Sequence, residues 1–389
     1  MFNRPKIEVL HLASFAGNIG DIANHKSFRR WFELLFSDYN VSWNNFEMRR
    51  FFRQELNVLN KFESKVSDCD LLIIGGGNFL ELWPENTPSG TSLPFSTQYL
   101  EQTNKPVFIN SIGVDDGQGI SQSASLNFKV LANFLASSER VFLTVRNDGS
   151  MRTISRFLDT ENYARCMKLP DHGFFLDKIE NAPRKKEHVL GINLAIDMPE
   201  FRFANNNNSP NQFLSEFANT LNSVAKENPH LKFKFIPHMY SDIEAYAVIL
   251  RNLKDELRRE RVTISTYNTS WNSKTISESY SGLSMLVAMR FHANVFGISQ
   301  NIPTFSIVSY PQIEKMINEM AIEKWPQYNL RWNQSLLHQN LSEFIKRRQE
   351  SGTYHMEKQI VTFLERLSDE RTQTGLELRK WLCRLINKK

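Results

Sequence analysis

The sequence has few cysteines, little net charge and no long hydrophobic run. Its three cysteines are isolated and form no CxxC pair, which argues against a disulfide framework and against a zinc site. Against 42 acidic residues stand 47 basic ones, so the formal charge is only +5. No segment approaches the length that a bilayer-spanning helix needs, and the N-terminus leads directly into a strand-like run. These features predict a cytoplasmic protein without a metal, a cofactor or a nucleic-acid partner.

Part of the basic excess lies in the C-terminal tail, in Lys346-Arg347-Arg348 and Arg379-Lys380. A solvated helical face is the simpler interpretation of such charges. Attraction to an anionic membrane surface or to an anionic substrate is the alternative. Peripheral contact with the inner face of the membrane therefore stays open.

Short apolar runs alternate with helical segments along most of the 389 residues, a pattern that predicts an α/β protein. The alternation of apolar runs and helical segments begins again after a charged, proline-containing linker at residues 178–188. We therefore expect two Rossmann-like, doubly wound domains facing across a cleft, as in the GT-B glycosyltransferases, with ligands at the carboxyl ends of the strands. The N-terminal domain would span residues 1–180, the C-terminal domain residues 188–335, and a helical tail, residues 336–389, would pack back on the N-terminal domain. Strands are predicted at residues 7–12, 70–74, 107–113, 141–145, 189–194, 232–237, 262–264 and 304–308, and a helix at residues 213–224.

The first motif, at residues 17–21, has the sequence GNIGD and lies between the first strand and a helix. Glycines allow a tight turn, and the N-terminus of a helix can hold an anion through its N–H groups. Asn18 and Asp21 are therefore candidate substrate-binding residues. The alternative is an ordinary strand-to-helix turn in which Asp21 caps the helix.

Two further motifs follow strands of the first half. Gly75, Gly76 and Gly77 form a wall without side chains against which a sugar or phosphate could lie, and Asn78 follows them. Arg146 ends another strand and would point toward the ligand. A surface arginine beside a helix cap is the equally weighted alternative for Arg146.

The second half carries two clusters that could perform chemistry. His238 and Asp242 follow a strand, where a buried, hydrogen-bonded histidine is the competing interpretation for His238. Arg290, Phe291 and His292 precede a small apolar helix. An arginine and a histidine at a helix N-terminus combine a fixed charge, the helix dipole and a proton carrier. This equipment suits a substrate with phosphate and carboxylate groups, so we predict His292, Arg290 and His238 as catalytic residues, with Asp242 and Phe291 in substrate binding.

In their order along residues 7–310, these motifs resemble the polysaccharide pyruvyl transferase family. The pattern runs GNIGD, GGGNF, VRxxxS, PHxxxD and RFHANVFGI, and it ends with NIP before a strand. The resemblance implies a GT-B-like fold and phosphoenolpyruvate as the donor. It also implies a sugar or lipid-linked glycan of a growing exopolysaccharide as acceptor, and a donor site that contains Arg290 and His292. The product would be a pyruvate ketal and phosphate.

A doubly anionic donor needs a second cation, for which Arg146, Arg202 and Lys315 are the candidates. Family members often carry an arginine at the end of the strand that opens the second domain, where this chain has Leu194-Ala195-Ile196-Asp197. Two other functions stay open. One is a GT-B glycosyltransferase that uses a nucleotide sugar, and the other is a non-catalytic glycan-binding protein with the same fold.

Overall fold

The computed structural model describes residues 4–179, 188–203, 209–271, 274–330, 336–351 and 354–386. Most of the predicted linker, residues 180–187, lies outside these ranges. The chain forms two compact units. Unit 1 comprises Met1–Phe15, Asn24–His172 and Glu365–Lys389, and unit 2 comprises Ala16–Ala23 and Gly173–Leu364. The GNIGD motif thus groups with the second half of the sequence.

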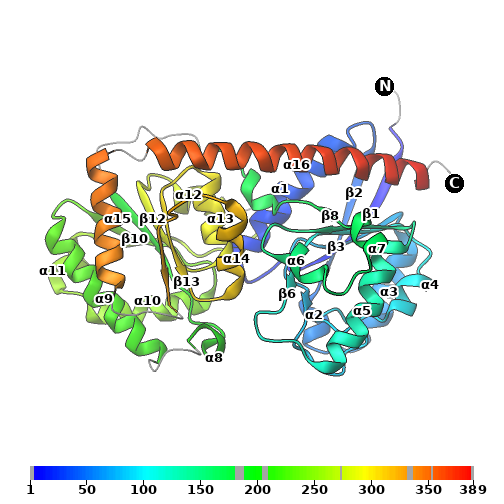
Figure 1. Ribbon diagram of the computed structural model, residues 1–389, viewed down its shortest axis with the longest axis horizontal. Coiled ribbons are helices and arrows are strands. Elements are labelled where there is room, and N and C mark those ends of the chain that lie inside the picture. The colour runs from blue at the N-terminus through cyan, green and yellow to red at the C-terminus, as the bar shows by residue number, and fades with distance from the viewer. Residues whose placement is uncertain are drawn as a thin grey trace. The chain divides into compact units, whose positions relative to one another are not determined.

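Unit 1 is built on a six-stranded parallel sheet (Figure 1). Its order is β2 (Asn40–Glu47), β1 (Lys6–Ala13), β3 (Leu71–Gly75), β5 (Val107–Ile112), β7 (Val141–Val145) and β8 (Met167–Lys168). The order reverses between β1 and β3, the position where doubly wound sheets bind ligands. Beyond the ends of β3 and β5, the short strands β4 (Leu80–Glu81) and β6 (Val114–Asp115) pair in a separate parallel ladder.

Both faces of this sheet are covered. Successive side chains of a strand point to opposite sides, so one strand contributes to two cores. Val9 and Ile73 lie in one core with Phe28 and Phe32 of α1, whereas Leu10 lies in the core of the other face. Apolar runs buried on both sides are typical of parallel strands. The helices of the first half are α1 (Ile19–Leu35), α2 (Arg49–Phe52), α3 (Val58–Asp68), α4 (Thr97–Gln102), α5 (Gln122–Ser137), α6 (Ser150–Ile154) and α7 (Thr160–Arg165), followed by the 3₁₀ turn η1 (His172–Phe175).

The C-terminal part of α16 (Tyr354–Ile386) packs within unit 1. Leu378, Trp381 and Leu382 join the core on the α1 face, and the Trp381 indole N–H donates to the Glu139 carbonyl over 2.9 Å. The preceding helix, α15 (Leu337–Ser351), instead contributes Phe344 to the core of unit 2. The predicted tail is therefore divided between the two units.

Unit 2 repeats the plan with a second six-stranded parallel sheet. Its order is β11 (Val262–Ile264), β10 (Lys232–Phe235), β9 (Val189–Asn193), β12 (Met285–Ala288), β13 (Thr304–Val308) and β14 (Gln327–Asn329). The switch point lies between β9 and β12, so residues that follow these strands occupy the expected ligand position. The remaining helices are α8 (Pro199–Arg202), α9 (Pro210–Glu227), α10 (Tyr240–Asn252), α11 (Asp255–Glu260), α12 (Thr275–Tyr280), α13 (Phe291–Ser299) and α14 (Pro311–Met320).

The predicted strands are all present, with ends that shift by at most two residues. The strands β2, β12 and β14, together with the two-residue strands, were not predicted. β12 is central to unit 2, and Arg290 follows it after a single intervening residue.

Candidate functional site

Arg290 lies at the switch point of unit 2, where Asn193 at the end of β9 fixes its backbone. The Asn193 side-chain oxygen accepts the Arg290 N–H at 3.1 Å. The Arg290 guanidinium is buried, with 8% of the side chain exposed. Its Nε lies 3.0 Å from each carboxylate oxygen of Asp242, and its Nη2 donates to Asp197 Oδ1 at 2.7 Å. Nη1 donates to no residue in the described part of the chain.

Asp242 organises the ends of three strands from the first turn of α10. It is fully buried and accepts hydrogen bonds from the His238 backbone N–H at 2.8 Å and from the Asn193 amide at 3.3 Å. Burial alone would lower the pKa of the Arg290 guanidinium. The carboxylates of Asp242 and Asp197 outweigh this effect, so the pKa is raised. Asp242 thus fixes the orientation of the Arg290 guanidinium, and its predicted part in substrate binding stays a prediction.

Asp197 joins Arg290 to a second buried arginine, Arg202. The Arg202 Nε donates to the Asp197 carbonyl at 2.9 Å, its Nη2 lies 3.4 Å from Asp197 Oδ2, and its Nη1 donates to Ser309 Oγ at 3.1 Å. Burial would raise the pKa of Asp197, but Arg202 and Arg290 lower it to about 2. One carboxylate therefore holds two guanidinium groups at the ends of β9, β12 and β13.

His238 is fully buried, as the competing interpretation of the sequence had it. Its Nε2 lies 2.9 Å from the Tyr280 hydroxyl, and its Nδ1 has no hydrogen-bond partner among the described residues. Burial, reinforced by the charge of Arg290, lowers the pKa of His238 well below the ordinary value. His238 is therefore a buried, hydrogen-bonded histidine, and its predicted catalytic role stays a prediction.

His292 lies one residue into α13, with 8% of its side chain exposed. Its Nδ1 is 3.5 Å from Asp21 Oδ1, and its ring stacks on Phe296 with centroids 5.8 Å apart. The predicted Phe291 contacts the same ring edge-on at 5.3 Å. Asp21 thus faces the histidine, whereas Asn18 accepts the Gly20 N–H at 2.9 Å and caps the turn.

The glycine run of unit 1 lies at the switch point between β1 and β3. Gly75 and Gly76 have φ values of +122° and +82°, which only glycine adopts readily. A Cβ on Gly75 would lie 2.5 Å from the Asn110 carbonyl oxygen. The Gly76 carbonyl accepts from the Asn24 amide at 2.7 Å, and the Asn110 amide nitrogen is buried without a partner among the described residues. Gly75 and Gly76 therefore bring backbone close to polar side chains, while a Cβ on Gly77 would press on the ring of Phe79.

Arg146 is buried in unit 1, so the surface alternative is wrong for this residue. Its Nε donates to Asp148 at 2.5 Å, its Nη2 donates to Asn78 at 3.3 Å, and Asp171 lies 3.8 Å from Nη1. Burial opposes the charge, but Asp148 and Asp171 raise the pKa of Arg146. A Cβ on Gly113 would lie 2.7 Å from Arg146 Nη2, so the arginine passes over bare backbone.

The family model of the polysaccharide pyruvyl transferases matches residues 18–310. The chain belongs to the polysaccharide pyruvyl transferase family. The match extends from Asn18 of the first motif, through the glycine run and Arg146, to Tyr310 beyond the Arg290 segment. It therefore includes the candidate residues of both units.

Solved structures share the fold at low sequence identity. HepE of Anabaena, determined with UDP and glucose, gives a TM-score of 0.54 at 11% identity over 97% of this chain and 99% of that one. MnaA of S. aureus, determined with UDP, gives 0.53 at 8% identity over 95% and 91%. The UDP-GlcNAc 2-epimerase of Neisseria meningitidis gives 0.54 at 9% identity over 94% and 100%. The chain matches no curated protein sequence. The predicted fold class, two Rossmann-like α/β units of GT-B type, is confirmed.

In this pyruvyl transferase family member, Glu81 and Asp115 form a carboxylate pair that was not predicted from the sequence. They are register partners on β4 and β6, and Asp115 accepts from the Asn78 amide at 2.7 Å. Burial first, and then the charge of Asp115, raises the pKa of Glu81 to about 7, although Ser92 donates a hydrogen bond to it. A carboxyl group of this kind can exchange a proton near neutral pH. Only the pairing of β4 with β6 reveals it, and two-residue strands leave no periodic signal.

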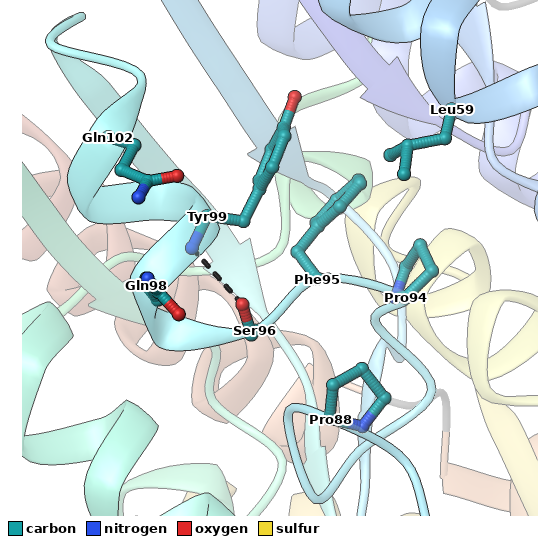
Figure 2. Close-up of a pocket in the computed structure, with 8 residues that line it drawn as sticks. All are labelled: Leu59, Pro88, Pro94, Phe95, Ser96, Gln98, Tyr99 and Gln102. Carbon is teal, nitrogen blue, oxygen red and sulfur yellow. Dashed lines mark hydrogen bonds between the residues drawn. The ribbon is translucent and has the colours of Figure 1, made fainter.

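A pocket of about 360 Å³ lies elsewhere in unit 1, lined by residues of α3, α4 and the loop before α4 (Figure 2). None of the predicted site residues lines it. Phe95 stacks on Phe62 at 4.9 Å and on Tyr99 at 5.2 Å, so these rings pack against one another and offer no open platform for a sugar. We interpret the pocket as a gap at the rim of the aromatic core.

Within the described residues, no group of three or more His, Cys, Asp or Glu side chains could hold a metal ion. In the same part of the chain, none of the helices combines the length and apolar character that crossing a membrane requires.

Proposed function

We propose that the protein transfers a pyruvyl group from phosphoenolpyruvate to two hydroxyls of a sugar in a polysaccharide or its precursor, forming a ketal and releasing phosphate. Family membership supports this reaction class. The observation that carries the proposal is the cluster at the switch point of unit 2. There, two guanidinium groups share Asp197, and His292 lies two residues after Arg290, in the first turn of α13.

Arg290 and Arg202 are the proposed donor-binding cations. Each guanidinium is oriented by fixed carboxylate contacts, so it would meet an anion without reorganising, and charge-assisted hydrogen bonds to carboxylate or phosphate are strong. Arg290 would use its Nη1 edge. Arg202 is the preferred second cation because Asp197 links it directly to Arg290, whereas Arg146 belongs to unit 1 and Lys315 lies on α14. The N-terminus of α13 adds the favourable end of its dipole.

His292 is the proposed proton carrier. Its imidazolium gives a proton to the methylene carbon of phosphoenolpyruvate, which creates cationic character at the neighbouring carbon. A sugar hydroxyl adds to that carbon and returns its proton to the imidazole. The bond to phosphate then breaks, the second hydroxyl closes the ketal, and its proton leaves with the phosphate. Proton transfer by a positioned side chain accelerates a reaction by roughly 10²–10⁴-fold.

The acceptor-side residues are proposed to be those of unit 1, namely the glycine run, Asn78 and Arg146. Sugar hydroxyls accept hydrogen bonds from amide and guanidinium donors. Glu81, the register partner of Asp115, joins this group as a candidate hydrogen-bond acceptor for a sugar hydroxyl.

The test is phosphate release from phosphoenolpyruvate in the presence of a β-galactoside, with mass spectrometry of the sugar to detect the ketal. His292→Ala should lower turnover by about 10²–10⁴-fold. His338→Ala is the matched control, since His338 also pairs with a carboxylate, Glu227, but has 44% of its side chain exposed. Full turnover by His292→Ala would contradict the role of this histidine, and no turnover by the native protein with any acceptor would contradict the function.

A glycosyltransferase that uses a nucleotide sugar is the second candidate, favoured by the UDP in two structures of similar fold. Thermal-shift measurements separate the two. Stabilisation by UDP-glucose but not by phosphoenolpyruvate would support the glycosyltransferase.

A further inference from the structure

Two hydrogen bonds hold the GNIGD motif in place within unit 2. The Ile19 N–H donates to the His238 carbonyl at 3.1 Å, and the Tyr267 hydroxyl donates to the Gly17 carbonyl at 2.9 Å. Together with the Asn18 cap, these contacts fix the first turn of α1. Asp21 lies in this turn and is only 17% exposed, so its carboxylate is held where it faces His292.

Gly20 makes this approach possible. A Cβ at position 20 would lie 2.6 Å from the His292 Cβ and 2.8 Å from its Nδ1. Since Gly20 is helical and does not have a positive φ, its backbone conformation does not require glycine. Alanine also favours a helix by roughly 1 kcal/mol over glycine. Space for the imidazole is therefore the local reason for glycine here.

The imidazole is thus held on several sides. Gly20 lies against it, Phe296 stacks on its face, and Phe291 contacts it edge-on. Asp21 lies at Nδ1. A carboxylate that accepts the Nδ1 proton selects one tautomer and leaves Nε2 as the nitrogen that exchanges a proton.

We propose that Asp21 is the positioning residue of His292, rather than a residue that binds substrate. It accepts the Nδ1 hydrogen bond, orients the ring and stabilises the imidazolium that gives its Nε2 proton to the donor methylene carbon. This role rests on the proposed function, because it assigns Asp21 to the proton carrier of that reaction.

Kinetics of variants distinguish positioning from substrate binding. Asp21→Asn should lower kcat by about 10²–10⁴-fold, as loss of a carboxylate that orients a catalytic histidine does elsewhere. The KM for phosphoenolpyruvate should stay within about threefold, because the proposed cations are untouched. Gly20→Ala should lower kcat in the same way while the protein stays folded. Asp255→Asn, an exposed carboxylate of unit 2, is the matched control and should leave both parameters unchanged.

A double variant tests whether Asp21 acts through the histidine. In the His292→Ala background, Asp21→Asn should cause no further loss, since residues that act as one unit are not additive. A further loss of tenfold or more would assign Asp21 an independent role and overturn the proposal.

Nitrogen NMR of ¹⁵N-histidine-labelled protein provides a readout that does not depend on turnover. At a pH where the imidazole is neutral, His292 should carry its proton on Nδ1 in the native protein and shift toward the Nε2–H tautomer in Asp21→Asn. An unchanged spectrum in Asp21→Asn would overturn the pairing. An inactive native protein would instead refute the proposed function, whereas an active protein with full kcat in Asp21→Asn would refute only the role of Asp21.

Discussion

Asp197 provides a quantitative test of the arginine cluster. Its carboxylate bridges Arg202 and Arg290, with 24% of its side chain exposed, and its pKa falls from the ordinary 3.8 to about 2. A difference of one pKa unit between the folded and unfolded states is equivalent to about 1.4 kcal/mol. The charged carboxylate therefore stabilises the fold by about 2 kcal/mol at neutral pH. Asp197→Asn should remove this contribution.

Urea-induced unfolding measures the loss. With a slope of roughly 2 kcal/mol per molar urea, the midpoint of Asp197→Asn at pH 7 should lie about 1 M below that of the native protein. The difference should also depend on pH. Because the folded pKa is depressed, the stabilisation is present above the unfolded pKa and is lost as the pH falls through the folded value. At pH 3 the difference between the two proteins should be about half its value at pH 7.

Asp255→Asn is the control for this measurement. Asp255 also pairs with two arginines, Arg258 and Arg259, but it is 60% exposed, and water and salt screen such pairs. Its midpoint should not change. Equal midpoints of Asp197→Asn and native protein at pH 7, or a difference that persists undiminished at pH 3, would refute the electrostatic account of the cluster.

Three further predictions concern other buried groups. Asp242→Asn should lower the free energy of unfolding by about 3–5 kcal/mol, because Arg290 loses its main buried counter-charge, and urea unfolding measures this loss. Gly75→Ala should destabilise the protein more than Gly119→Ala in the same assay. Both glycines have positive φ, worth roughly 1–2 kcal/mol with alanine, but only Gly75 also lacks room for a Cβ. Cys383, which is partly exposed, should react first with a thiol reagent followed by peptide mapping, because burial raises the pKa of the other two cysteines to about 11 and about 12.

The sequence predicts the strands that are buried on both faces and bounded by turns. β3 is such a strand, with an apolar run that ends in glycines. β12 was not predicted because Met285–Ala288 is followed almost directly by the apolar helix α13. Periodicity does not separate adjoining apolar segments. β2 escaped for the opposite reason. It is an edge strand, and its sequence NVSWNNFE is mostly polar, with only Phe46 fully buried.

The sequence predicts that the candidate residues lie at the ends of strands. It does not predict which of these residues contact one another. Arg290 and Asp242 follow different strands, and the rule that ligands bind at carboxyl ends brings them to the same edge of the sheet. The rule does not say that Asp242 would be fully buried and bonded to the arginine. That outcome depends on the strand order, which places β9 between β10 and β12. Asp197 and Glu81 had no sequence signal, since their importance arises only from neighbours distant in the chain.

The first motif belongs to a different unit from the strand that precedes it in the chain. Residues 17–21 follow β1 of unit 1 in the chain, so the sequence rhythm assigns them to the first half. Their contacts are with His238, Tyr267 and His292, and they group with unit 2. A glycine without positive φ has no explanation within its own helix, because alanine would favour that helix more. The imidazole that fills the space supplies the explanation, so Gly20 and His292 constrain each other: a side chain at position 20 displaces the ring, and a displaced ring leaves Asp21 without the group that it orients.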